Sequence, residues 1–174
     1  MKNLKDYIRN IEDFPKKGII FRDVTTVIQD KDGLKLAIDQ MKKKVEDVDF
    51  DVIVAPESRG FIFGMPLAYA LEKSFVPVRK KGKLPCKTIE QSYDLEYGSA
   101  TLEIHQDSIK PGQKVIIVDD LLATGGTLEA IIKLVERLGG KVEGIWCLIE
   151  LVDLKGRQRL NGYKVDSCVE FEGE

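Results

Sequence analysis

The sequence contains few of the side chains that build metal centres or disulfide frameworks. Its 174 residues include three cysteines and one histidine. Cys86, Cys147 and Cys168 lie far apart, and no C-x-x-C pair occurs. We therefore expect neither a cysteine-rich zinc site nor a set of disulfides, and no metal site built by the protein alone. The same pattern predicts a reducing cytoplasmic location.

Long apolar runs and an excess of charge of one sign are also missing. The longest mostly apolar stretch, Gly60–Leu71, is interrupted by Gly64 and Pro66 and is shorter than the roughly 20 residues that span a bilayer. The first residues are charged throughout, which argues against a secretory signal peptide. Lysine and arginine number 27 against 29 aspartate and glutamate, a net charge of −2. We therefore expect neither a membrane nor a nucleic acid as a partner.

Apolar patterning, by contrast, is strong along the whole chain. No linker or repeat divides it, and its length fits one domain over residues 1–174. The patterns predict helices at residues 2–13, 32–48, 61–71 and 127–138, and strands at residues 51–56, 75–78, 100–104, 114–120, 142–151 and 163–169. This alternation indicates an α/β fold with a mainly parallel central sheet flanked by helices, whose ligands bind beyond the carboxyl ends of the strands.

The segment VIIVDDLLATGGT, residues 115–127, carries the clearest chemical signal. A buried strand delivers Asp119 and Asp120 to the sheet edge, and a turn of small residues then leads into a helix. Outward-facing backbone N–H groups and the helix N-terminus suit a phosphate, with Thr124 and Thr127 as hydroxyl donors. The alternative is an ordinary strand-to-helix turn capped by Thr127. Neither a Walker G-K-[ST] loop nor a G-x-G-x-x-G fingerprint is present.

This segment resembles the phosphoribosyl pyrophosphate signature of the type I phosphoribosyltransferases. Five further segments are similar to the adenine phosphoribosyltransferases and follow the order of that family: FPKKGIIFRDVT, APESRGF, RKKGKLP, LEYG and IELVDLKGR. The resemblance covers nearly the whole chain. It implies the type I fold, with a small N-terminal hood formed mainly by residues 1–30, a flexible loop over the site, and a homodimer.

The resemblance also implies how the ribose phosphate is held. Asp119 and Asp120 would hold the ribose hydroxyls and assist the positive charge that develops on the sugar ring. Mg²⁺ would bind through the substrate diphosphate and ribose and would neutralise charge there. The loop that would wrap the 5′-phosphate consists of Ala123, Thr124, Gly125, Gly126 and Thr127.

Basic residues are implied to hold the pyrophosphate that leaves. Arg59 would meet it from a turn in which a cis peptide near Glu57–Ser58 is expected by analogy, and Arg79, Lys80 and Lys83 would add positive charge. Such cations suit a leaving group whose charge grows as the C1–O bond breaks. For the run that begins at Arg79, a solvated loop or a weak RNA-binding patch is the alternative.

Residues 81–100 lack a clear period, which is typical of a loop that closes over a site. By resemblance, this loop carries Glu96 and Tyr97 over the substrate. Glu96 is our candidate for the acid/base group that exchanges a proton with the purine ring. Alternatively, Glu96 caps a strand or pairs with a lysine.

The hood is implied to recognise the base. Phe21 would stack on adenine and Leu151 would cover the other face, while the backbone of Ile20 and Arg22 would read the exocyclic amine and a ring nitrogen. A backbone carbonyl accepts from the amine of adenine but would face an oxygen in hypoxanthine, a mismatch of about 1–3 kcal/mol. The alternative is that Phe21 and Leu151 are simply core residues.

Together these inferences predict an enzyme of purine salvage. It would transfer the 5-phosphoribosyl group of 5-phospho-α-D-ribose 1-diphosphate to adenine and release AMP and pyrophosphate. Two alternatives stay open: a transferase for hypoxanthine, guanine or xanthine, and a regulator that binds the phosphoribosyl donor without catalysis.

Overall fold

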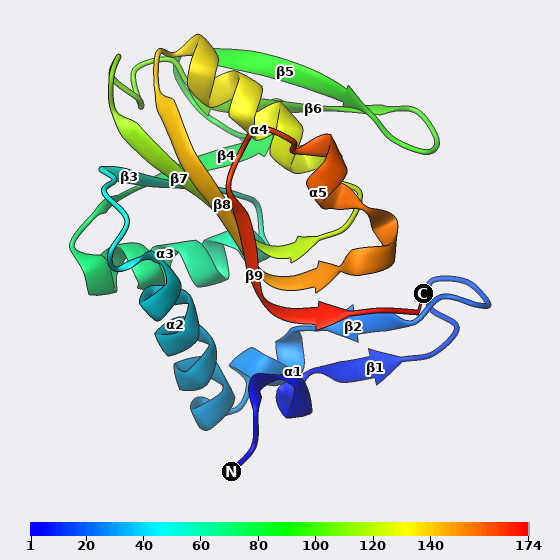
Figure 1. Ribbon diagram of the computed structural model, residues 1–174. Coiled ribbons are helices and arrows are strands. Elements are labelled where there is room, and N and C mark those ends of the chain that lie inside the picture. Colours follow the sequence, from blue (N-terminus) through cyan, green and yellow to red (C-terminus); the bar gives the residue numbers. More distant parts are fainter. Residues whose placement is uncertain (174) are drawn as a thin grey trace.

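A seven-stranded sheet forms the centre of the computed structural model, which describes residues 1–173 (Figure 1). The strands lie in the order β5-β6-β4-β3-β7-β8-β9. The pairs from β4 through β9 are parallel, whereas β6 runs antiparallel to both β4 and β5. The bounds are β3 Val52–Pro56, β4 Ser74–Lys80, β5 Thr88–Asp94, β6 Ser99–His105, β7 Lys114–Leu122, β8 Lys141–Leu151 and β9 Val165–Phe171. This arrangement confirms the predicted α/β fold with a mainly parallel sheet.

Helices cover both faces of this sheet because its central strands are apolar on both sides (Figure 1). Along β7, Ile116 and Val118 pack into the core beneath α2 and α3, whereas Val115 and Ile117 pack into the core beneath α4. The helices are α1 Thr25–Ile28, α2 Lys31–Val45, α3 Arg59–Leu71, α4 Gly126–Arg137 and α5 Gly156–Arg159, with 3₁₀ turns η1 Leu4–Tyr7 and η2 Val152–Leu154.

The N-terminal segment is not the helix that its spacing predicts, so the prediction for residues 2–13 was wrong. After η1 the chain forms a strand, β1 Arg9–Ile11, which pairs antiparallel with β2 Phe21–Asp23. An ion pair of 2.6 Å between Arg9 and the buried Asp23 reinforces the pairing. Pairing with residues 21–23, outside the segment, therefore decides its structure, and the periodicity of residues 2–13 cannot show it. The helix predicted to end at residue 48 ends at Val45.

Residues 81–100 are also more ordered in structure than predicted. Residues 88–94 form β5, which pairs with β6 from Thr88 opposite His105 to Asp94 opposite Ser99. Ile89 and Tyr93 of β5 pack against the core beneath α4, and this burial fixes the strand. The prediction of one long loop was therefore wrong for β5, and the irregular parts are residues 81–87 and the hairpin tip at 95–98.

The hood, formed by β1, β2 and the turns around them, lies beside the carboxyl end of β9 (Figure 1). The guanidinium of Arg22 lies 4.2 Å from the ring centre of Phe171, the last residue of β9. This cation–π contact places the hood next to the sheet edge at which ligands of parallel sheets bind. The predicted single domain ends at Glu174, which lies outside the described residues.

Candidate active site

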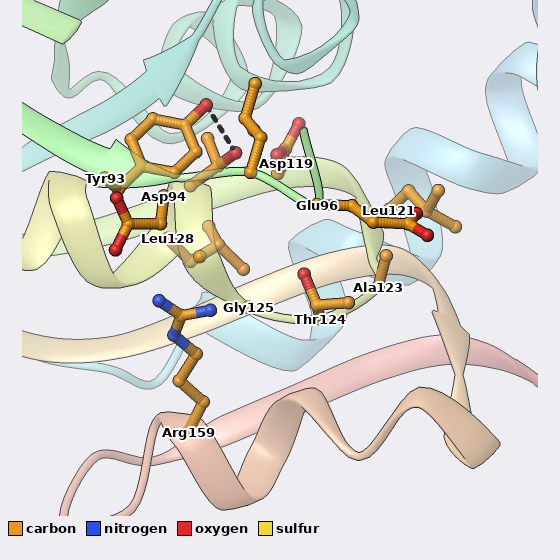
Figure 2. A pocket seen from close by; sticks show the side chains of 13 residues that line it. Tyr93, Asp94, Glu96, Asp119, Leu121, Ala123, Thr124, Gly125, Leu128 and Arg159 are labelled. Atoms are coloured by element: carbon orange, nitrogen blue, oxygen red, sulfur yellow. Dashed lines mark hydrogen bonds between the residues drawn. The ribbon is translucent and has the colours of Figure 1, made fainter. Parts of the chain in front are cut away.

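A cavity of about 590 Å³ lies where β7 ends and α4 begins (Figure 2). The tip of the β5–β6 hairpin and α5 complete its walls. Its lining residues are Tyr93, Asp94, Leu95, Glu96, Asp119, Leu121, Ala123, Thr124, Gly125, Gly126, Thr127, Leu128 and Arg159. All five residues of the predicted phosphate loop are therefore brought together in one cavity.

The phosphate loop presents an uncapped helix N-terminus to this cavity. Gly125 stands at the N-cap position of α4, so no side chain satisfies the first N–H groups of the helix. Gly125 has a φ of +90°, and a Cβ there would lie 3.0 Å from the carbonyl oxygen of Gly156. Only glycine fits this turn, and the exposed N–H groups can bind an anion.

A hydroxyl of the phosphate loop is hydrogen-bonded to the hairpin. The Thr127 hydroxyl donates to the Tyr93 hydroxyl at 3.1 Å, across from α4 to β5 (Figure 2). This contact holds β5 beside the phosphate loop. It also engages the Thr127 hydroxyl, which the sequence predicts as a hydrogen-bond donor to the phosphate.

Asp119 and Asp120 occupy different environments although they are adjacent in β7. The Asp119 carboxyl faces the cavity and accepts from the Asp120 backbone N–H at 2.8 Å. Asp120 is buried, and its carboxylate pairs with the Arg59 guanidinium at 2.9 Å. Desolvation, followed by the nearby Asp120 carboxylate, raises the pKa of Asp119 well above its ordinary value, and Arg59 only partly opposes this.

Arg59 begins α3 directly after a turn that contains a cis peptide bond between Glu57 and Ser58, as predicted. Its guanidinium pairs with Asp120 and lies 5.9 Å from the ring centre of Phe21. Arg59 thus connects the acid pair of β7 to the hood. Arg59 does not line the cavity around the phosphate loop, hereafter called the phosphate cavity.

The other predicted cations lie on and after β4. The Glu57 carboxylate accepts from the Arg79 Nε at 3.2 Å and from the Lys80 backbone N–H at 2.8 Å. Lys83 is exposed, on a short loop whose backbone is held by the buried Glu103. Burial alone would raise the pKa of Glu103, but hydrogen bonds from the backbone of residues 84, 82 and 83 outweigh it and lower that pKa.

The hairpin tip carries the candidate acid/base residue. Glu96 lines the cavity, whereas Tyr97 is 85% exposed and lies outside the lining. The structure thus brings Glu96, but not Tyr97, to the phosphate loop (Figure 2).

The residues predicted to hold the base lie in the hood and at the end of β8, outside the phosphate cavity. Phe21 and Arg22 belong to β2, directly after Ile20, and all three are partly exposed. The Phe21 ring meets the ring of Phe14 edge to face at 5.3 Å. Leu151 is buried at the carboxyl end of β8.

Comparison with known proteins gives a consistent result. A family model described as a phosphoribosyl transferase domain matches residues 24–173. The chain is 63% identical to an adenine phosphoribosyltransferase of Lachnoclostridium phytofermentans and 64% identical to one of Agathobacter rectalis, each over the full length of both chains. The chain belongs to the adenine phosphoribosyltransferase family. The predictions of a pentosyltransferase of purine salvage and of the type I fold are confirmed.

Solved structures of this family have the same fold. An adenine phosphoribosyltransferase from Thermoanaerobacter pseudethanolicus superposes with a TM-score of 0.93 at 54% identity, covering 97% of this chain and 98% of that one. The enzyme from Saccharomyces cerevisiae superposes with a TM-score of 0.91 at 41% identity, covering 95% and 96%. That structure is a complex with adenine and an imino-altritol bisphosphate.

Six residues that line the cavity of this adenine phosphoribosyltransferase were not predicted from the sequence, and Tyr93 and Arg159 are two of them. Tyr93 was assigned to an irregular loop, and the sequence TIEQSYD of β5 has no apolar alternation that would have indicated a strand. Arg159 follows the segment IELVDLKGR by two residues, and no local pattern shows that α5 folds against the phosphate loop.

Neither a metal cage nor a membrane span is visible in the described part of the chain. Residues 1–173 contain no cluster of three or more His, Cys, Asp or Glu side chains placed to hold a metal ion. No helix among them has the length and apolar character needed to cross a membrane.

Proposed function

We propose that this site transfers the 5-phosphoribosyl group of 5-phospho-α-D-ribose 1-diphosphate to adenine, giving AMP and pyrophosphate. One observation carries the proposal: an uncapped helix N-terminus and an acid pair lie side by side at the carboxyl end of one buried strand. A ribose 5-phosphate carries the two matching kinds of group, a phosphate at one end and hydroxyls on the sugar. The phosphate binds residues 123–127, and Asp119 and Asp120 bind the hydroxyls.

The acid pair also stabilises the reaction electrostatically. As pyrophosphate leaves, positive charge develops on the ribose ring, and carboxylates fixed beside the ring favour that charge. The Asp120 carboxylate is held in place by its ion pair with Arg59 at 2.9 Å. Arg59 lies after the carboxyl end of β3, with Arg79 and Lys80 on the neighbouring β4 and Lys83 on the loop after β4, and this grouping supports a role with the leaving group. These four cations favour the pyrophosphate as its charge grows.

Magnesium fits this donor set as an ion held partly by the substrate. Mg²⁺ prefers oxygen ligands and usually keeps only one or two protein carboxylates. Asp119 and Asp120 provide carboxylate oxygens, and the diphosphate and ribose would provide the others. When bound, Mg²⁺ would neutralise charge on the diphosphate. Omission of Mg²⁺, with EDTA present, should abolish turnover, and full turnover without divalent ions would contradict this assignment.

The base binds between Phe21 and Leu151 under the hood. Phe21 is fixed by its edge-to-face contact with Phe14, and this fixed ring provides a stacking surface. The backbone of Ile20 and Arg22 reads the edge of adenine. A backbone carbonyl accepts a hydrogen bond from the exocyclic amine of adenine, whereas an oxopurine would place its own carbonyl oxygen against that group. The adenine named in the yeast structure supports this choice of base.

Glu96 acts as the acid/base group because it is the carboxyl of the hairpin tip, residues 95–98, that lines the cavity. Tyr97 belongs to the same tip, which would cover the substrate. Glu96→Ala should lower kcat by about a hundredfold or more, with little change in affinity for the phosphoribosyl donor. Glu90→Ala, which removes an exposed carboxyl of the same hairpin outside the cavity, is the matched control. Equal kcat for Glu96→Ala and the wild type would remove Glu96 from the mechanism.

We further propose that the enzyme is a cytoplasmic homodimer. The family resemblance supports this assembly, and α3 exposes the apolar side chains of Met65 and Tyr69 one turn apart. Sedimentation equilibrium should give twice the chain mass of 19.6 kDa. A monomer at assay concentration would contradict the dimer.

Product formation with adenine, hypoxanthine, guanine and xanthine in parallel tests the choice of base. AMP and pyrophosphate should appear with adenine alone. Preference for an oxopurine would keep the phosphate site and refute the base assignment. Binding of the phosphoribosyl donor without turnover of any base would instead support a regulator.

A further inference from the structure

The charge of the phosphate cavity is unfavourable for the ligand that it is proposed to hold. Among its lining residues, Asp94, Glu96 and Asp119 carry carboxyl groups, and Arg159 is the single basic residue. A phosphate dianion that enters beside carboxylates needs a cation nearby to offset their repulsion. We propose that Arg159 binds the 5′-phosphate directly, an inference that rests on the proposed function.

The Arg159 side chain runs along the glycines of the phosphate loop. A Cβ placed on Gly126 would lie 3.2 Å from Nη1 of Arg159, and one placed on Gly125 would lie 3.5 Å from its Cβ. Figure 2 shows the guanidinium reaching from α5 toward the loop that carries Gly125 and Thr124. The guanidinium therefore lies beside the N–H groups that the phosphate would meet at the start of α4.

The guanidinium is oriented, and its terminal nitrogens remain available. Its Nε pairs with Glu129 of α4 at 3.3 Å, with both side chains partly exposed. Within the described residues, no other hydrogen bond involves the Arg159 side chain. A guanidinium anchored through Nε presents Nη1 and Nη2 as a planar fork, which matches two oxygens of a phosphate.

The short helix α5 is held firmly enough to position this fork. Gly156 packs so tightly that a Cβ there would lie 2.5 Å from the Ala123 carbonyl oxygen. The neighbouring Arg157 donates from Nε and Nη2 to the buried Glu150 at 2.8–2.9 Å. The arrangement of Arg159 beside the phosphate loop is therefore built into the fold before any ligand binds.

Arg159 differs in position from the cations assigned to the leaving group. Arg59, Arg79, Lys80 and Lys83 do not line the phosphate cavity. Loss of Arg159 should therefore weaken ligands that carry a 5′-phosphate and spare pyrophosphate.

Calorimetric titration with ribose 5-phosphate and with pyrophosphate separates these two roles. Arg159→Met should weaken ribose 5-phosphate by about ten- to a hundredfold, the range for a charge-assisted hydrogen bond, and leave pyrophosphate within about twofold. Arg159→Lys, which keeps the charge but not the fork, should lose less. Lys133→Met is the matched control, because Lys133 approaches the same Glu129 at 3.9 Å from outside the cavity.

Each outcome decides the inference. Unchanged ribose 5-phosphate affinity in Arg159→Met overturns it, as does an equal loss for both ligands or an equal loss in Lys133→Met. A wild-type chain that binds ribose 5-phosphate and converts adenine, together with an unaffected Arg159→Met, overturns this inference alone. A wild-type chain that neither binds ribose 5-phosphate nor converts adenine overturns the proposed function with it.

Discussion

A methyl group added at Gly156 should disturb the phosphate loop from behind. Gly156 opens α5 and is buried against the loop that follows β7. In Gly156→Ala, the new Cβ would lie 2.5 Å from the Ala123 carbonyl oxygen and 2.7 Å from Cδ1 of Leu122, whereas ordinary contact begins at 3.4 Å. Because the carbonyl belongs to the backbone, α5 and the phosphate loop must separate by close to an ångström.

The size of the effect follows from two opposing terms. Overpacking in a filled core costs about 1–3 kcal/mol. The higher helix propensity of alanine relative to glycine stabilises the folded protein by up to about 1 kcal/mol. We therefore expect a loss of roughly 1–2 kcal/mol in the free energy of unfolding. A displacement of about an ångström in a positioning loop can lower kcat/KM by as much as a hundredfold.

Urea unfolding and steady-state kinetics test both effects. The KM for the phosphoribosyl donor should rise more than the KM for adenine, because the displaced loop is the proposed binding site for the 5′-phosphate of the donor. Gln158→Ala, which alters an exposed residue of the same helix, should leave both measurements unchanged. Wild-type stability together with wild-type donor affinity in Gly156→Ala would refute the argument from packing.

Two further substitutions test charged groups. Glu103 accepts a hydrogen bond from the Leu84 N–H at 2.7 Å, so Glu103→Gln should loosen the loop that carries Lys83. Calorimetry should then show pyrophosphate binding weakened by about 1–3 kcal/mol and ribose 5-phosphate binding unchanged. Asp119→Asn should stabilise the fold while lowering activity. The raised pKa of Asp119 means that stability falls as pH rises above the ordinary value of 3.8, so the gain in thermal stability should be present near neutral pH and absent below 3.8.

The parts of the fold that the sequence predicted well are those determined by local pattern and burial. The apolar run of β7 can only be a strand covered on both faces, and its end fixes where Asp119 and Asp120 lie. Helix α4 combines an apolar face with glycines at its start, so its position and its phosphate loop were both predictable. The five residues of that loop do line one cavity.

The parts that were missed depend on partners outside the segment itself. The segment after η1 became a strand because β2 pairs with it, an interaction that spacing within residues 2–13 cannot show. Arg159 enters the cavity because Gly156 and Arg157 fix α5 against the rest of the fold. A basic residue after IELVDLKGR has no distinctive spacing, so only tertiary structure reveals its neighbours.

Two side chains proposed to bind substrate, Arg59 and Thr127, contact other side chains of the protein in this structure. Arg59 pairs with Asp120, and Thr127 donates to Tyr93. A buried charge or hydroxyl without a partner is unfavourable, so these internal contacts stabilise the fold when no ligand is bound. A ligand oxygen that takes the place of such a contact gains only the difference in free energy between the two. Arg159, like Arg59, is engaged only through its Nε, so its terminal nitrogens can bind a phosphate without breaking a contact within the described residues.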